Sequence, residues 1–280
     1  MNAGATIPTP VETTLQNIQL RVQVSRRLHL SAWSLELFSP FWRLYVNDRS
    51  GAFVRTNERV YDLEPGNLYL IPAWVEFSTG LNRPVVHDFI HFYVSGFPVM
   101  LHSRLFNRPL TLACDDLLGS LRDRWRGCAA RGSPREWPDF GWASALAHAA
   151  LANVLAGLET ADREASAQWL TKAEEVRPAL VAIETHLADP PTNARLAALC
   201  GRSENHFVRV FSRAMGLTPA RYGLERRLEV AASGLVGTNR SIELIAAETG
   251  FTDRFHFSRA FKARFKCAPA AYRRTHRRGD

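Results

Sequence analysis

Several features that define large classes of proteins are missing from this sequence of 280 residues. Its cysteines form no CxxC pair and no spacing typical of a disulfide framework: Cys114, Cys128, Cys200 and Cys267. No run approaches the roughly 18 consecutive apolar residues of a membrane span. The N-terminus lacks the basic and apolar segments of a secretion signal. We therefore expect a soluble, reduced, cytoplasmic protein that does not contact membranes.

Sequence signatures of common catalytic sites are also absent. The chain has no serine nucleophile elbow, no P-loop and no GxGxxG after a predicted strand. No histidine occurs between His29 and His87, so the clustered ligands of a metal enzyme are missing. His87 and His91 share one face of a predicted strand, but strand rise separates them by about 13 Å, too far to share one metal. We expect no catalytic residues, no metal and no cofactor.

Charge is divided unevenly along the chain. The formal net charge is +8, yet residues 192–280 hold 17 Lys+Arg against 7 Asp+Glu, a net of +10. The other 191 residues hold 18 against 20, a net of −2. A positive field confined to one end favours a polyanionic partner such as nucleic acid, rather than an ordinary solvated surface.

The basic end contains an internal repeat. Phe207-Val208-Arg209-Val210-Phe211 recurs 50 residues later as Phe257-Ser258-Arg259-Ala260-Phe261. Leu196-Ala197 with Gly201 likewise matches Ile245-Ala246 with Gly250. Each copy is typical of a helix, a tight turn and a second helix, over about 192–214 and 241–265, the arrangement that presents the second helix to a major groove. Four residues are expected to cap these helices: Thr192, Ser203, Ser241 and Thr252.

The second helix of each copy has an apolar and a polar face. Phe207 and Phe211, with Phe257 and Phe261, are expected in the core. We predict that residues on the outward faces and at the helix N-termini contact double-stranded DNA: Ser203, Glu204, Asn205, Val208, Arg209, Ser212, Arg213, Ser241, Arg254, Ser258, Arg259 and Lys262.

The two equivalent arginines, Arg209 and Arg259, are the first candidates for reading bases, because a guanidinium is well shaped for bidentate contact with guanine. Contact with phosphates only, or pairing with Glu204 or Asp253, is the alternative. The other outward residues differ between the copies, so the two units are expected to read different base sequences.

Residues 192–274 resemble the DNA-binding domain of the AraC/XylS family of bacterial transcription regulators. The resemblance is carried by matching positions in both copies: Leu196-Ala197, Ser203, Arg209, Phe211, Gly216, Pro219, Tyr222, Arg227, Ala231, Ile242, Ile245-Ala246, Gly250-Phe251, Asp253, Phe257, Phe261, Phe265, Pro269 and Tyr272-Arg273. Lys266 replaces a glycine that the family usually has, so its turn is expected to be altered. The resemblance implies two units in successive major grooves, about 34 Å apart, with RNA polymerase as a further partner and a nucleoid location.

The N-terminal part predicts short strands between residues 20 and 97, then helices over 117–125, 142–158 and 175–187. Residues 66–77 resemble the second signature of cupin barrels, with Trp74 at the glycine position and Phe77 at that of a metal histidine. The expected fold class is α+β multidomain: a cupin-like β-barrel, a helical connector and an all-α double helix-turn-helix. The expected domains are residues 1–110 (arm and effector-sensing domain), 111–172 (connector) and 173–280 (DNA-binding domain).

The barrel is expected to bind a small-molecule effector. Strand alternation places Phe41, Arg43, Tyr45 and Asn47 together, and an arginine with aromatic neighbours can hold a carboxylate or sugar hydroxyls. The candidate effector residues are Trp42, Arg43, Tyr45, Trp74, His87 and His91. Arg43 on the surface beside an ordinary aromatic core is the alternative.

A stripe of apolar residues runs from Trp142 to Leu158 at i, i+4 spacing. Such a stripe can either pack on its own domain or form a dimer contact, and we expect a homodimer.

The favoured function is a ligand-responsive transcription regulator. The alternatives are a cupin-type enzyme with a basic tail that localises it to DNA or a surface, and a constitutive DNA-binding protein with a ligand-free barrel.

Overall fold

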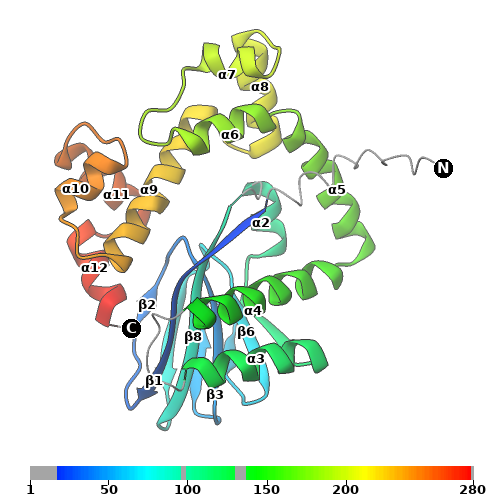
Figure 1. Ribbon diagram of the computed structural model, residues 1–280, viewed down its shortest axis with the longest axis vertical. Coiled ribbons are helices and arrows are strands. Elements are labelled where there is room, and N and C mark those ends of the chain that lie inside the picture. The colour runs from blue at the N-terminus through cyan, green and yellow to red at the C-terminus, as the bar shows by residue number, and fades with distance from the viewer. Residues whose placement is uncertain (1–17, 96–98, 130–136, 279–280) are drawn as a thin grey trace.

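The protein combines a β-rich N-terminal domain with an arc of helices that leaves this domain and returns to it (Figure 1). The computed structural model describes residues 18–95, 99–129 and 137–278. In Figure 1 the sheets occupy the lower half of the view, and the last helix, in red, ends beside the strand β2. This arrangement confirms the predicted fold class of a β-rich domain followed by an all-α domain.

Two antiparallel sheets form the N-terminal domain. The larger sheet has the order β1-β8-β3-β6-β9, with β1 at Gln19–Leu30, β8 at Val85–Ser95, β3 at Trp42–Asn47, β6 at Asn67–Ile71 and β9 at Leu110–Ala113. The smaller sheet has the order β2-β7-β4-β5, with β2 at Glu36–Leu37, β7 at Phe77–Leu81, β4 at Ala52–Arg55 and β5 at Val60–Asp62.

Alternation along β3 separates two cores. Trp42, Leu44 and Val46 face the helices that cover the larger sheet, whereas Tyr45 packs in the core between the two sheets. Successive side chains of a strand point to opposite faces, so every residue of β3 is buried, on one face or the other. Arg43 and Asn47, the alternating neighbours of Tyr45, share its face.

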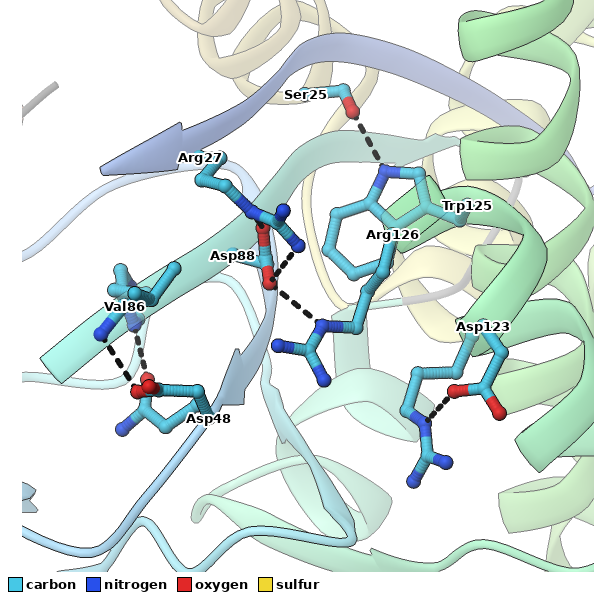
Figure 2. Close-up of polar contacts among 11 residues, drawn as sticks. Ser25, Arg27, Asp48, Val86, Asp88, Asp123, Trp125 and Arg126 are labelled. Carbon is cyan, nitrogen blue, oxygen red and sulfur yellow. Dashed lines mark hydrogen bonds and ion pairs between the residues drawn. The ribbon is translucent and has the colours of Figure 1, made fainter. Parts of the chain in front are cut away.

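Three helices accompany the larger sheet: α2 (Val99–Leu105), α3 (Asp116–Ala129) and α4 (Trp137–Ala156). Asp88 of β8 is fully buried and binds two guanidinium groups, with its carboxylate oxygens 2.6 Å from Arg27 Nε and 2.8 Å from Arg126 Nε (Figure 2). The Trp125 indole donates a hydrogen bond of 2.8 Å to Ser25 Oγ. These contacts join α3 to β1 and β8, because burying the Asp88 carboxylate requires its charge to be paired.

The apolar stripe on α4 packs on its own sheet. Leu146 and Ala150 are fully buried in the core of the larger sheet, and Trp142 and Val154 pack against that core. Most of the stripe therefore packs on its own domain. The helix predicted over 142–158 corresponds to α4, which begins earlier, at Trp137.

The remaining helices form the arc: α5 (Thr160–Glu174), α6 (Arg177–Thr185), α7 (Asn193–Leu199), α8 (Glu204–Met215), α9 (Pro219–Gly237), α10 (Ile242–Glu248), α11 (Arg254–Phe265) and α12 (Pro269–Arg278). In Figure 1, α5 rises from the β domain to α7 and α8, and α9 descends to α10, α11 and α12. The predicted boundary at residue 110 falls inside this packing, since β9 pairs with β6 across it. By packing, α3 and α4 belong with the sheets, and α5 alone leads away from them.

No single described helix is long and apolar enough to cross a membrane, although α4 from Phe140 and α5 pass that test as a pair bent by 113°. Most of the apolar face of α4 is buried in the core of the larger sheet, as described above.

The turns of the two helix-turn-helix units differ in what surrounds them. Gly201 and Gly250 both have the left-handed backbone that favours glycine, with φ of +62° and +75°. A Cβ on Gly201 would meet nothing within 4 Å, but one on Gly250 would lie 1.9 Å from the Ala188 carbonyl oxygen. The turn of the second unit therefore packs directly against the backbone of the segment between α6 and α7, just before the first unit begins.

We expect Gly201→Ala to lower the free energy of unfolding by about 1 kcal/mol, the cost of a left-handed alanine. Gly250→Ala should lose about 1–3 kcal/mol more, because its methyl group must push the Ala188 backbone away. Urea unfolding of the two variants measures the difference. Equal losses would show that Gly250 does not pack closely against the Ala188 backbone.

Candidate nucleic-acid interface and sensor cavity

The two helix-turn-helix units are built by the same local contacts. Thr192 caps α7 and Ser241 caps α10, their hydroxyls accepting hydrogen bonds of 3.3 Å from Arg195 N and 3.1 Å from Leu244 N. Ser203 is at the N-cap of α8 but makes no capping bond with its side chain. The cap of α11 is Asp253, whose carboxylate accepts from His256 N at 2.7 Å.

The cap expected from Thr252 is therefore wrong by one residue. The carboxylate of Asp253 carries a full negative charge at the positive end of the helix, which favours it over a hydroxyl. The hydrogen bond from the His256 backbone is also the main reason why the pKa of Asp253 is lowered.

Phenylalanines hold each second helix on its unit. Phe207 and Phe211 of α8 are fully buried, with ring centroids 5.6 Å apart. Phe257 and Phe261 of α11 are equally buried, at 5.4 Å. Fully burying such a side chain stabilises the fold by about 1.5–3 kcal/mol. The repeated phenylalanines thus fix which face of each helix is left for contact with a partner.

The predicted contact residues lie on those outward faces. The exposed members are Ser203, Glu204, Asn205, Arg209, Arg213, Ser241, Arg254, Arg259 and Lys262. The half-buried members are Val208, Ser212 and Ser258. In both units the residues from the N-cap through the arginine show the same order of exposure and burial, so Arg209 and Arg259 project from equivalent places.

Pairing within the protein does not occupy the two arginines. Neither Arg209 nor Arg259 forms an ion pair within 4 Å of an acidic side chain in the part of the chain that the structure describes. Arg254 differs, because its guanidinium lies 2.5 Å from Glu243 of α10, with both side chains more than half exposed. An exposed pair of this kind contributes little stability, so Arg254 can exchange Glu243 for another anion at small cost.

Phe255 is a surface residue that the sequence patterns did not single out. It is the second residue of α11, and 76% of it is exposed, the largest fraction among the exposed large apolar residues. A single exposed apolar residue is ordinary on a protein surface, but this one lies on the outward side of α11, among the predicted contact residues. The signal was present in the repeat, because residue 205, the equivalent position in α8, is the polar Asn205.

The turn at Lys266 follows the glycine pattern despite the side chain. Lys266 has φ of +62° and its N–H bonds to the Lys262 carbonyl oxygen at 2.9 Å. Gly216 ends α8 in the same way, with φ of +76° and a bond of 2.9 Å to Ser212 O. The expected alteration of this turn is therefore wrong: the lysine adopts the left-handed conformation, at a backbone cost of about 1–3 kcal/mol.

Helix α9 ties the two units together through buried charge. Arg226 binds Glu184 of α6 at 2.7 Å and also pairs with Glu229 one turn further along α9. Although burial disfavours its charge, the carboxylates of Glu229 and Glu184 raise the pKa of Arg226. Arg227 donates to the Thr249 carbonyl oxygen at 2.6 Å, in the turn of the second unit. Through adjacent arginines, α9 is therefore bound both to α6, which packs in the core of the first unit, and to the turn of the second unit.

A second candidate site lies between the sheets. Arg43, Tyr45, His87 and His91, all predicted as effector residues, line one cavity of about 20 Å³. The strand register explains why these side chains lie together, because β3 and β8 pair Arg43 with His91 and Tyr45 with Phe89. Two of its walls come from the far end of the chain: Thr275 and His276 of α12.

Charge in this cavity is not balanced by any described acid. The Arg43 guanidinium, 1% exposed, lies 4.3 Å from the Phe41 ring centroid and 5.1 Å from that of Phe77. Its Nε has no hydrogen-bond partner within the described ranges. Burial lowers the pKa of His87 to about 3, and burial followed by the Arg43 charge lowers that of His276 to about 4.

The two tryptophans proposed as effector residues lie elsewhere. Trp42 faces the helix side of the sheet, and Trp74 packs against α11, its indole centroid 3.4 Å from the Arg264 guanidinium carbon. Both line a cavity of about 310 Å³ between the β domain and α9. Trp74 has φ of +65°, which matches the glycine position it holds in the cupin signature. The six candidates thus fall into two separate cavities, not one.

Metal coordination finds no support in the described residues. No three His, Cys, Asp or Glu side chains of that part of the chain come together in a way that could hold a metal ion. His87 uses its Nδ1 in a 2.7 Å hydrogen bond with Asn47 Oδ1.

Similarity in sequence to known proteins is concentrated in the C-terminal part of the chain, where the two helix-turn-helix units lie. A family of helix-turn-helix domains matches residues 196–275. A segment of 86 residues is 34% identical to the MmsAB operon regulatory protein of Pseudomonas aeruginosa, covering 31% of this chain and 28% of that protein. A segment of 106 residues is 36% identical to the transcriptional regulator Rob of Salmonella typhimurium, covering 38% and 37%. The chain therefore matches only about a third of the length of these curated relatives.

One solved structure resembles nearly the whole chain. ToxT from Vibrio cholerae covers 93% of this chain and 98% of its own, with a TM-score of 0.51 and 13% sequence identity. At this identity the similarity concerns the fold alone, and it extends to the order of a β-rich domain followed by helix-turn-helix units.

Proposed function

We propose that this chain, whose residues 196–275 form a helix-turn-helix domain of the AraC/XylS type, is a transcription regulator that binds DNA through both units. The observation that carries the proposal is the pair of outward arginines, Arg209 and Arg259, placed identically on two phenylalanine frames. The net charge of +10 over residues 192–280 supports binding to a polyanion.

Each second helix is proposed to enter one major groove. The linking helix α9, together with the contact of Gly250 against the segment that leads into α7, holds the units in one fixed order, so the two helices would enter grooves about one helical turn apart. Because Asn205 and Val208 of α8 are replaced by Phe255 and Ser258 in α11, the two half-sites would differ in sequence. A half-buried Val208 and an exposed Phe255 suit contact with thymine methyl groups.

Control by a small molecule is the second part of the proposal. The cavity around Arg43 joins one buried cation to aromatic walls, as small-molecule sites commonly do. The β-rich domain would then act as a cupin-like sensor in the bacterial cytoplasm. A cupin-type enzyme remains the rival function, but among the described residues the sheets bring together no metal-binding cluster that would support it.

Contacts with RNA polymerase and with a second copy of the chain complete the proposal. The α4 stripe is poorly suited to the second contact, because its residues Leu146 and Ala150 are buried in their own domain. Leu117 of α3, 62% exposed, marks a more suitable surface on the same domain.

The arginines provide the direct test of DNA reading. Selection of bound sites from random DNA should give a two-part site for the full chain. Arg209→Ala and Arg259→Ala should each relax one base position, the two positions about ten base pairs apart. The expected loss of discrimination is about 1–3 kcal/mol, roughly 5- to 150-fold.

Arg59→Ala is the matched control, since it removes the same charge from an exposed turn of the β domain. If both recognition-helix variants weaken binding to all sequences alike, the arginines contact phosphates and the assignment is wrong.

Phe255 gives a test that does not depend on charge. We expect Phe255→Ala to leave the free energy of unfolding within about 0.5 kcal/mol of the parent, because the ring is exposed. Binding to the selected site should weaken about tenfold, as measured by fluorescence anisotropy, if the ring packs on a base in the groove. Phe140→Ala, at the other large exposed phenylalanine, should change neither quantity. Unchanged binding by Phe255→Ala would remove this residue from the interface.

A further inference from the structure

The cavity around Arg43 is closed by the DNA-binding half of the protein. Thr275 and His276, in the last turns of α12, complete a wall that is otherwise made by strands β2, β3 and β8 and the neighbouring residues Trp33 and Leu35. The His276 ring meets Phe41 edge-on with centroids 5.9 Å apart. A helix that packs on the second helix-turn-helix unit therefore forms part of the wall of the proposed sensor cavity.

The chemistry of this cavity favours an anion. Arg43 is 1% exposed, forms no ion pair with a described carboxylate, and leaves its Nε without a hydrogen-bond partner among the described residues. A buried charge without a counter-charge is costly. His276 Nε2, another donor or acceptor on the same cavity, also has no partner in the described part of the chain. The guanidinium lies against the Phe41 and Phe77 rings, and Trp33, Leu37 and Phe89 provide apolar walls.

The size of the cavity decides how such an anion could enter. About 20 Å³ is room for roughly one water molecule, so any organic ligand must move part of the wall. The strand walls are fixed by the ladder that pairs Arg43 with His91 and Tyr45 with Phe89. His276, in contrast, sits in the final turns of the last helix, so it is the wall that can leave without breaking a sheet.

We propose that the cavity around Arg43 binds a small apolar carboxylate, and that this ligand takes the place of the His276 end of α12. The inference rests on the proposed function, because it gives the effector a chemical class and a route to the DNA reader. The carboxylate would pair with the Arg43 guanidinium, and its hydrocarbon part would replace the His276 ring against Phe41.

A movement of His276 would be transmitted to the second helix-turn-helix unit through Tyr272. Tyr272 stacks on His276 with ring centroids 3.9 Å apart, and it also packs on Phe261 and Phe265 of α11, at 5.3 and 5.1 Å. The second unit also meets aromatic rings of the β domain through Arg264 and Phe265, which lie against Trp74, and Arg264 lies over the Phe38 ring as well. Loss of the His276 contact therefore loosens the second unit from the β domain, while the first unit keeps its place.

Binding is tested with benzoate and its neutral isostere benzamide, using calorimetry on the full chain. Benzoate should bind at least tenfold more tightly than benzamide. Arg43→Gln should abolish that preference, whereas Arg55→Gln, which removes an exposed guanidinium that lies over the half-buried Phe53 ring of β4, should retain it. Without ligand, Arg43→Gln should also melt at a higher temperature, because it removes an unpaired buried charge.

Competition between the ligand and the His276 ring is tested with a substitution in α12. His276→Ala should bind benzoate about tenfold more tightly than the parent, because the ligand no longer has to displace the ring. His148→Ala, on the exposed face of α4, should bind as the parent does. In the unmodified chain, benzoate should increase amide hydrogen exchange of α12 and α11 several-fold, and benzamide should not.

Two results would overturn the inference. One is absence of Arg43-dependent benzoate binding at millimolar concentration. The other is weaker binding by His276→Ala with greater protection of α12, because the helix would then close over the ligand instead of competing with it. DNA selection on the same preparations separates the two levels. If benzoate fails but the two-part site persists, only the sensor inference falls; if no specific site is selected, the proposed function itself falls.

Discussion

Helix α12 belongs to two cores at once, and the arrangement of the whole chain depends on that sharing. Its Tyr272 is part of the phenylalanine core of the second helix-turn-helix unit, and His276, one turn later, closes the cavity between the sheets. Because one short helix satisfies both, the second unit cannot take a new position without exposing apolar surface on the β domain. The first unit has no such constraint, since it meets the β domain chiefly through the connecting helix α5.

The two units share a frame but not a reading surface. Phe207 and Phe211, with Phe257 and Phe261, orient each second helix in the same way. The exposed residues around Arg209 and Arg259 differ, as does the setting of the two turns, free at Gly201 and tightly packed at Gly250. Duplication has therefore preserved the way in which a helix is presented and changed what it presents. A chain of this kind is suited to an asymmetric site, with the order of the two readers fixed by α9.

The parts that the sequence could predict are those governed by local pattern. Period and offset identified the repeated phenylalanines, and alternation along β3 placed Arg43 with Tyr45 and Asn47. Contacts between distant segments left no pattern to follow, so the role of His276 at the Arg43 cavity could not be foreseen. Adjacent residues were also misjudged where alternation was not applied, since Trp42 and Arg43 point to opposite faces of one strand. Lys266 shows a further limit of prediction from sequence. The chain adopts a left-handed turn at this lysine, although the residue type predicts an altered turn.

We propose that one chain places two different recognition helices, α8 and α11, in successive major grooves of the DNA. Hydroxyl-radical footprinting of the full chain on its selected site measures this directly. Two protected windows are expected, centred about ten base pairs apart on one face of the duplex and different in sequence. A single window of about half a turn, or two windows with the same sequence, would contradict the claim.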